Sequence, residues 1–271
     1  MKNLLTRSLT GLIYLVVFIG SLITGKYSFG LLFLVINVLA LWEFYQLAGN
    51  SGHRSGKILG IITGCFLFIA TFYVYAFGNS PLFLSLIIPF IIFIIISELY
   101  AKNSTPLVNI AITVFGILYI SFPLSLFNHF AFFEHDDYSY QIILGFFILL
   151  WTNDTIAYLS GVSFGKHRLF ERISPKKSWE GFIGGTLASL ILAFFLNSLL
   201  NQLNRTDWLV IGLIISIVGV YGDLVESMFK RAADLKDSGK ILPGHGGMLD
   251  RIDSVLLSSP LVFTYLLIFK S

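Results

Sequence analysis

The sequence predicts an all-α integral membrane protein, a polytopic bundle of about nine transmembrane helices that forms one domain over residues 1–271. Hydrophobic residues make up 56% of the chain and charged residues 12%, whereas soluble domains average about 25% charged residues. Mean hydropathy is correspondingly high, at +0.82. Apolar runs follow one another without a linker-like stretch, so the composition excludes an ordinary soluble protein.

Each predicted span is close to the length that a helix needs to cross a hydrocarbon core of about 30 Å. The first span follows Lys2 and Arg7 and could be a signal peptide, but no Ala-x-Ala site follows it and further spans do. We therefore count it as a span. In chain order, the predicted spans are Leu9–Thr24, Ser28–Leu47, Ile58–Phe77, Leu82–Glu98, Leu107–Phe127, Gln141–Gly161, Gly181–Leu200, Trp208–Glu226 and Ser254–Phe269.

The basic residues are distributed unevenly between alternate loops. Only Lys26, Arg205 and Lys270, of 18 Lys and Arg residues, fall on one side. Because cytosolic loops carry an excess of Lys and Arg, we expect a cytosolic N-terminus and an outside C-terminus. The net charge of +3 does not suggest a nucleic-acid partner, and the single cysteine, Cys65, excludes an internal disulfide.

Charged side chains inside membrane spans are costly, so their positions point to function. The acidic ones gather at or just below the predicted cytosolic interface. Asp223, Glu226, Ser227 and Lys230 share one helix face by their i, i+3, i+4 and i+7 spacing. Two facing carboxylate pairs would suit a hard cation such as Mg²⁺. The alternative is a set of interfacial charges neutralised by nearby Lys and Arg. The carboxylates concerned are Asp154, Glu180, Asp223, Glu226, Asp250 and Asp253.

A basic segment precedes the seventh predicted span. Ser174 is a suitable N-cap and Pro175 a suitable first helical residue. The helix N-terminus would then offer free N–H groups beside Lys176 and Lys177, which predicts an anion site. The alternative is a basic stretch attracted to anionic lipid headgroups.

A glycine-rich segment, Pro243-Gly244-His245-Gly246-Gly247, lies in the longest polar cytosolic stretch. Its glycines permit backbone conformations that other residues rarely adopt, so N–H groups could approach a phosphate or a base. His245 could carry a proton, or it could be a loop histidine bonded to the backbone. Glycine-rich turns are common, so the segment alone does not define a site.

The run from Ser227 to Asp253 resembles the signature of the phosphatidate cytidylyltransferases, also called CDP-diacylglycerol synthases. Shorter segments around Asn153–Gly161, Ser174–Gly181 and Gly222–Ser227 are similar to the same family, although Ser178 stands where Thr is more usual. The resemblance covers about 120 C-terminal residues, so residues 141–271 are expected to carry the catalytic motifs. The positions that match the signature are Ser227, Phe229, Lys230, Arg231, Lys236, Asp237, Gly239, Leu242, Pro243, His245, Gly246, Gly247, Met248, Asp250, Arg251, Ile252 and Asp253.

The resemblance implies transfer of the cytidylyl group of CTP to phosphatidate at the cytosolic face of a membrane, expected to be a bacterial cytoplasmic membrane. It implies Mg²⁺, a second cation such as K⁺, and a homodimer. By their positions, Asp223 and Asp250 are the leading metal ligands, with Asp253, Glu226 and Asp154 in support. The expected catalytic residues are Asp223, Asp250, Lys230, Arg231 and Lys236. The expected substrate-binding residues are Ser174, Lys176, Lys177, Ser227, His245, Gly246, Gly247 and Arg251.

Two other functions are compatible with an acidic, multi-span protein. One is a CTP-using enzyme that acts on an ether-linked or polyprenyl lipid, because headgroup chemistry does not select the lipid backbone. The other is a cation transporter, which should place carboxylates near the bilayer midplane with access from both sides. The outer halves of these spans are almost free of ionisable groups, which disfavours the transporter.

Overall fold

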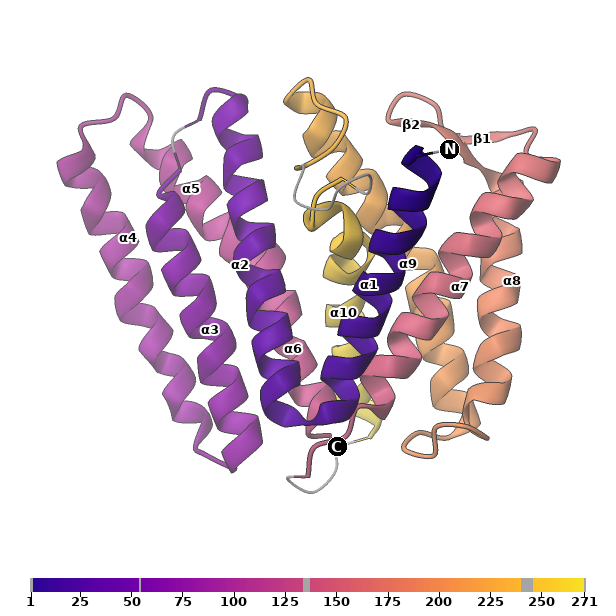
Figure 1. Ribbon diagram of the computed structural model, residues 1–271. Helices are drawn as coiled ribbons and strands as arrows, with labels where there is room; N and C mark the ends of the chain where they lie inside the picture. Colours follow the sequence, from indigo (N-terminus) through magenta and orange to yellow (C-terminus); the bar gives the residue numbers. More distant parts are fainter. Residues whose placement is uncertain (1, 54, 134–136, 240–245, 271) are drawn as a thin grey trace. The chain divides into compact units, whose positions relative to one another are not determined.

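The computed structural model describes residues 2–53, 55–133, 137–239 and 246–270, and most of these residues are helical (Figure 1). The prediction of an all-α fold is confirmed, with one addition: a two-stranded antiparallel hairpin. The chain forms two compact units. Unit 1 comprises residues 1–138 and 232–252, and unit 2 comprises residues 139–231 and 253–271.

The number of long apolar helices is that of a multi-pass membrane protein. Within the described residues, 8 helical segments are long and apolar enough to span a membrane, and α1 adds a shorter apolar stretch, Gly11–Thr24. The count of nine spans and their orientation therefore stay predictions. The helices are α1 (Lys2–Thr24), α2 (Lys26–Asn50), α3 (Lys57–Phe77), α4 (Ile87–Ala101), α5 (Pro106–Gly116), α6 (Phe122–Ala131), α7 (Gln141–Phe164), α8 (Trp179–Leu196), α9 (Arg205–Ala232) and α10 (Leu249–Phe269), with a 3₁₀ turn, η1 (Pro81–Leu86), a π-turn, η2 (Ile117–Ser121), and the strands β1 (Arg168–Phe170) and β2 (Ser174–Ser178).

In unit 1, the C-terminal half of α2 is held by a buried tyrosine. The Tyr45 hydroxyl donates a hydrogen bond to the carbonyl oxygen of Thr113 in α5, at 2.7 Å. Gly60 and Gly116 make room for this side chain, because an added Cβ would lie 2.3 Å and 2.7 Å from the Tyr45 hydroxyl oxygen. The contact fixes α2 against α3 and α5, two residues beyond the buried Glu43.

In unit 2, α7 and α8 pack closely through glycines, with the hairpin of β1 and β2 connecting them (Figure 1). An added Cβ at Gly181 would lie 2.7 Å from the carbonyl oxygen of Ala157, and one at Gly185 would lie 2.7 Å from that of Asn153. Two glycines four residues apart are a common means of close helix approach in membranes. The packing fixes the hairpin at one end of the α7–α8 pair.

Also in unit 2, α9 contacts α10 near both ends. An added Cβ at Gly222 would lie 2.5 Å from the carbonyl oxygen of Asp253. Near the other end, Asp207 of α9 accepts a hydrogen bond from the Tyr265 hydroxyl at 2.8 Å and pairs with Lys270 at 2.9 Å. These contacts set the register between the two helices that carry the candidate site.

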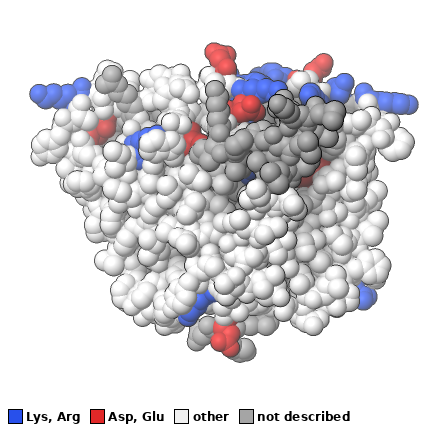
Figure 2. All heavy atoms as spheres, in the orientation of Figure 1, with Lys and Arg blue, Asp and Glu red and all other residues white. Residues whose placement is uncertain are grey.

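Charged side chains occur mainly towards the helix ends, and the middle of the face in Figure 2 is almost free of them. Large apolar side chains such as Leu31, Ile92 and Ile191 are exposed along the helices. Exposed apolar side chains between polar ends are the pattern expected of helices that face lipid.

Candidate active site

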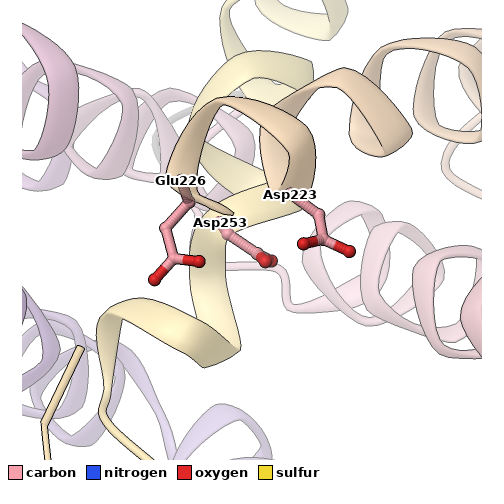
Figure 3. Close-up of side chains that lie close together, drawn as sticks. All are labelled: Asp223, Glu226 and Asp253. Atoms are coloured by element: carbon pink, nitrogen blue, oxygen red, sulfur yellow. The ribbon is translucent and has the colours of Figure 1, made fainter. Parts of the chain in front are cut away.

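Three carboxylates converge where α9 meets α10 in unit 2. Asp223 and Glu226 come from α9 and Asp253 from α10, and Figure 3 shows all three. One carboxylate oxygen of each lies within 4.8 Å of the others. Glu226 is buried, and the other two are partly exposed. The close approach at Gly222 brings the two helices near enough for these side chains to meet.

The predicted shared face of α9 is confirmed by its contacts. Ser227 donates a hydrogen bond from its hydroxyl to Asp223 Oδ1 at 3.1 Å, four residues earlier. Lys230 forms an ion pair with Glu226, also four residues earlier. Because residues four apart lie on the same side of a helix, one face of α9 presents two carboxylates, a hydroxyl and an ammonium group.

A second lysine reaches the group from the hairpin. Lys177 of β2 pairs with Asp223 Oδ2 at 2.5 Å and lies 3.5 Å from the carbonyl oxygen of Val220. Three carboxylates are thus held together with two ammonium groups. Carboxylate oxygens are the ligands that Mg²⁺ takes in proteins, and the donor set of Asp223, Glu226 and Asp253 fits such an ion.

Asp250 is in different surroundings from this group. Its Oδ2 accepts hydrogen bonds from the backbone N–H of Gly247 at 2.7 Å and of Ser238 at 3.1 Å, and from the Ser238 hydroxyl at 3.0 Å. Asp250, Gly247 and Ser238 all belong to unit 1, whereas Asp253, one helical turn later on α10, belongs to unit 2. One Asp250 oxygen therefore holds the loop before α10, and its role as a leading metal ligand stays a prediction.

Glu43 of α2 was not identified from the sequence, although it is the most buried acidic side chain among the described residues of unit 1, with 1% of its surface exposed. Its Oε2 accepts hydrogen bonds from the backbone N–H of Leu249 at 2.8 Å and from the Ser238 hydroxyl at 3.1 Å. A carboxylate inside a predicted span is costly and indicates function by itself. That signal was present in the sequence.

The prediction that Ser174 caps a helix is wrong. Ser174–Ser178 is strand β2, paired with β1 through Arg168 with Ser178 and Phe170 with Ser174. The extended pairing continues to residue 178, so α8 begins only at Trp179. Its N-cap is Ser178, whose hydroxyl accepts a hydrogen bond from the Gly181 N–H at 3.2 Å.

The helix N-terminus at which the anion site was predicted is that of α8, which begins at Trp179. The first turn of α8 carries its own carboxylate, Glu180, which accepts hydrogen bonds from the backbone N–H of His167 at 3.2 Å and pairs with the His167 ring at 2.7 Å. Of the two lysines, Lys177 points to Asp223, and Lys176 is exposed. The helix end therefore already holds a negative side chain, which favours Lys177 over the N–H groups as the anion-binding element.

The other predicted residues that the structure describes are not members of the group of Asp223, Glu226 and Asp253. Asp154 is exposed on α7 and accepts a hydrogen bond from the Asn153 amide at 3.4 Å. Gly246 has a φ of +79°, a conformation that favours glycine. His245 lies outside the described residues. The cations Arg231, Lys236 and Arg251 are exposed, and Ser174 is partly exposed.

Comparisons with known proteins extend the similarity beyond the C-terminal motifs. A model of the cytidylyltransferase family matches residues 5–269. The phosphatidate cytidylyltransferase of Staphylococcus aureus (strain COL) is 35% identical over 260 residues, which cover 94% of this chain and 96% of the relative. The protein of that name from Bacillus subtilis (strain 168) is 32% identical, with 100% of both chains covered. The one from Haemophilus influenzae is 44% identical over 143 residues, covering 51% of this chain and 49% of the relative. With this coverage and these converging carboxylates, the chain belongs to the cytidylyltransferase family.

Proposed function

We propose that this membrane protein transfers the cytidylyl group of CTP to phosphatidate, producing CDP-diacylglycerol and pyrophosphate for phospholipid biosynthesis. The family match over residues 5–269 and the names of the relatives support the reaction. The observation that carries the proposal is the group of Asp223, Glu226 and Asp253 beside Lys177 and Lys230. Such a group suits the binding of a polyphosphate and a cation.

The reaction needs little acid–base catalysis. A phosphate oxygen of phosphatidate forms a bond to the α-phosphorus of CTP, the bond from that phosphorus to the bridging oxygen breaks, and pyrophosphate leaves. A phosphate monoester has a second pKa near 6, so the attacking group is largely ionised at pH 7. The protein must mainly neutralise charge and align the reacting groups.

The carboxylate group is the proposed place for Mg²⁺. Asp223 and Asp253 would hold the ion with Glu226 beside them, and Asp250 and Asp154 are further candidates from the sequence. When bound, the ion supplies positive charge to the phosphates of CTP. A monovalent cation such as K⁺ and a homodimeric state belong to the same proposal.

The lysines are suited to bind phosphate once substrate arrives. Lys177 and Lys230 each form an ion pair with a carboxylate, Lys177 with Asp223 and Lys230 with Glu226. If a cation were held by those carboxylates, it would compensate their negative charge, and the ammonium groups of Lys177 and Lys230 would then be available to bind phosphate oxygens. The exposed Lys176, Arg231, Lys236 and Arg251 add positive charge that attracts CTP and phosphatidate.

The proposed reaction is tested with purified protein in lipid nanodiscs, CTP labelled at the α-phosphate, and a panel of lipid phosphates. We expect label in the lipid product and one pyrophosphate released per product, with phosphatidate as the preferred acceptor. A preference for an ether-linked or polyprenyl phosphate would replace the acceptor in this proposal. If no lipid phosphate accepts the label with Mg²⁺ present, the proposed reaction is wrong.

A further inference from the structure

Glu43 is a buried carboxylate to which the proposed reaction assigns no role. It lies on α2, about 200 residues before the glycine-rich loop, with 1% of its surface exposed. A buried carboxylate is tolerated only where specific partners offset its loss of water. Among the described residues, its hydrogen-bond partners are the Ser238 hydroxyl and the Leu249 N–H, which both donate to Oε2.

Two glycines that lie on either side of positions 240–245, Gly239 and Gly247, both approach this carboxylate. An added Cβ at Gly239 would lie 2.3 Å from Glu43 Oε1, and one at Gly247 would lie 2.4 Å from Oε2. Any side chain at either position would displace the carboxylate or the loop. The two glycines therefore permit the backbone on each side of the loop to touch one acidic side chain.

Ser238 connects Glu43 to Asp250. Its hydroxyl lies 3.1 Å from Glu43 Oε2 and 3.0 Å from Asp250 Oδ2. A hydroxyl has one proton to donate, so it can serve only one of these oxygens at a time. The backbone N–H of Ser238 donates to Asp250 Oδ2 as well, at 3.1 Å. A change at Glu43 therefore reaches Asp250 through one intervening residue.

Glu43 also holds the start of α10. The Leu249 N–H is one of the first N–H groups of that helix, which have no partner within the helix, and Glu43 accepts it at 2.8 Å. Asp250 accepts the N–H of Gly247, three residues before it, in the manner of a capping box. The first turn of α10 is thus fixed by two carboxylates, one from its own chain segment and one from α2.

We propose that Glu43 is a positioning residue for cytidylyl transfer: it anchors Ser238 and the first residue of α10, Leu249, and thereby sets the orientation of Asp250. The inference rests on the proposed function for its effect on turnover. The hydrogen bonds of Glu43 to Ser238 and Leu249 do not depend on that function. Residues that orient a ligand through hydrogen bonds change activity roughly 10- to 100-fold when removed, and we expect a loss in that range in kcat.

The test compares Glu43→Ala and Glu43→Gln with a matched control, Glu98→Gln. Glu98 is another acidic residue of unit 1, and its Oε1 accepts hydrogen bonds from Asn103 and Asn109, both at 2.7 Å. We expect Glu43→Ala to lower kcat while the KM for CTP changes less than about threefold. Glu43→Gln keeps one acceptor oxygen and should recover much of the loss, and Glu98→Gln should resemble the parent protein.

Hydrogen exchange of the backbone N–H groups of Gly247 and Leu249 supplies the second readout. In Glu43→Ala these two should exchange faster, and in Glu98→Gln they should not. If Glu43→Ala does not fold, Ser238→Ala removes the same connection and should give the same loss of kcat. Unchanged exchange in the loop, or a kcat within about threefold of the parent protein for both Glu43→Ala and Ser238→Ala, overturns the inference. A parent protein without transferase activity would contradict the proposed function, and the exchange measurement would still decide the anchoring.

Discussion

Single residues show which of the predicted charges act together. The sequence spacing correctly placed Asp223, Glu226, Ser227 and Lys230 on one face of α9, because helical periodicity fixes neighbours three and four residues apart. The spacing did not predict that Lys177 contacts Asp223 while Lys176 is exposed. Adjacent residues of an extended strand point to opposite sides, which only the observed strand β2 reveals.

This alternation gives a prediction for the two lysines. Lys177→Gln should lower kcat/KM by at least about tenfold, about 1.4 kcal/mol of transition-state stabilisation, because it removes the ammonium group beside Asp223. Lys176→Gln changes an exposed side chain one residue away and serves as the matched control, with an expected loss of less than about threefold. Steady-state kinetics over a range of CTP and Mg²⁺ concentrations measure both. Equal losses in the two variants would show that overall basic charge, and not the contact with Asp223, is what matters.

The sequence predicts the helices but not the contacts between them. Long apolar runs identified the helices, since a membrane leaves few alternatives for the backbone. The hairpin was missed because Ser-Pro before two lysines is also a good helix start, and the choice is made by pairing with Arg168–Phe170. The contact between Glu43 and Ser238 joins residues 195 positions apart, a distance over which periodicity carries no information.

The contact between α9 and α10 gives a prediction for Gly222. In Gly222→Ala the new Cβ would meet the carbonyl oxygen of Asp253 at 2.5 Å and the Cα of Ser254 at 2.9 Å, so α10 must move. We expect kcat to fall by about tenfold or more, because misplaced catalytic groups are costly, and the thermal midpoint to fall. Gly20→Ala is the control: an added Cβ there meets nothing within 4 Å, and alanine favours a helix. Equal activity and melting temperature for the two variants would argue against close packing at Gly222.

At the scale of the whole molecule, the asymmetry of basic residues predicts which side of the membrane the site faces. All but three of the 18 Lys and Arg residues fall on the side assigned to the cytosol. The hairpin that carries Lys177 is on that predicted side, and the start of α9 at Arg205 is on the other. CTP is a cytosolic substrate, so the proposed function requires the same orientation.

Orientation is measured by labelling single cysteines in a Cys65→Ser background, since Cys65 is the one cysteine of the chain. Arg172→Cys in the turn of the hairpin and Arg205→Cys both replace exposed residues. In intact cells an impermeant thiol reagent should label Arg205→Cys and leave Arg172→Cys unlabelled until the membrane is opened. The reverse pattern would invert the predicted topology.

In the proposed mechanism, carboxylates from α9 and α10 form one cation site that carries the transfer. Turnover of Asp223→Asn, Asp253→Asn and the double variant, measured across Mg²⁺ concentrations, tests this shared site, because Asn keeps the shape and removes the charge. Each single variant should lose at least about 100-fold in kcat, and the double variant should lose little more, since residues that act as a unit are not additive. If either single variant keeps more than about a third of the parent turnover at ordinary Mg²⁺, or if the two losses simply multiply, the carboxylates do not share a catalytic cation.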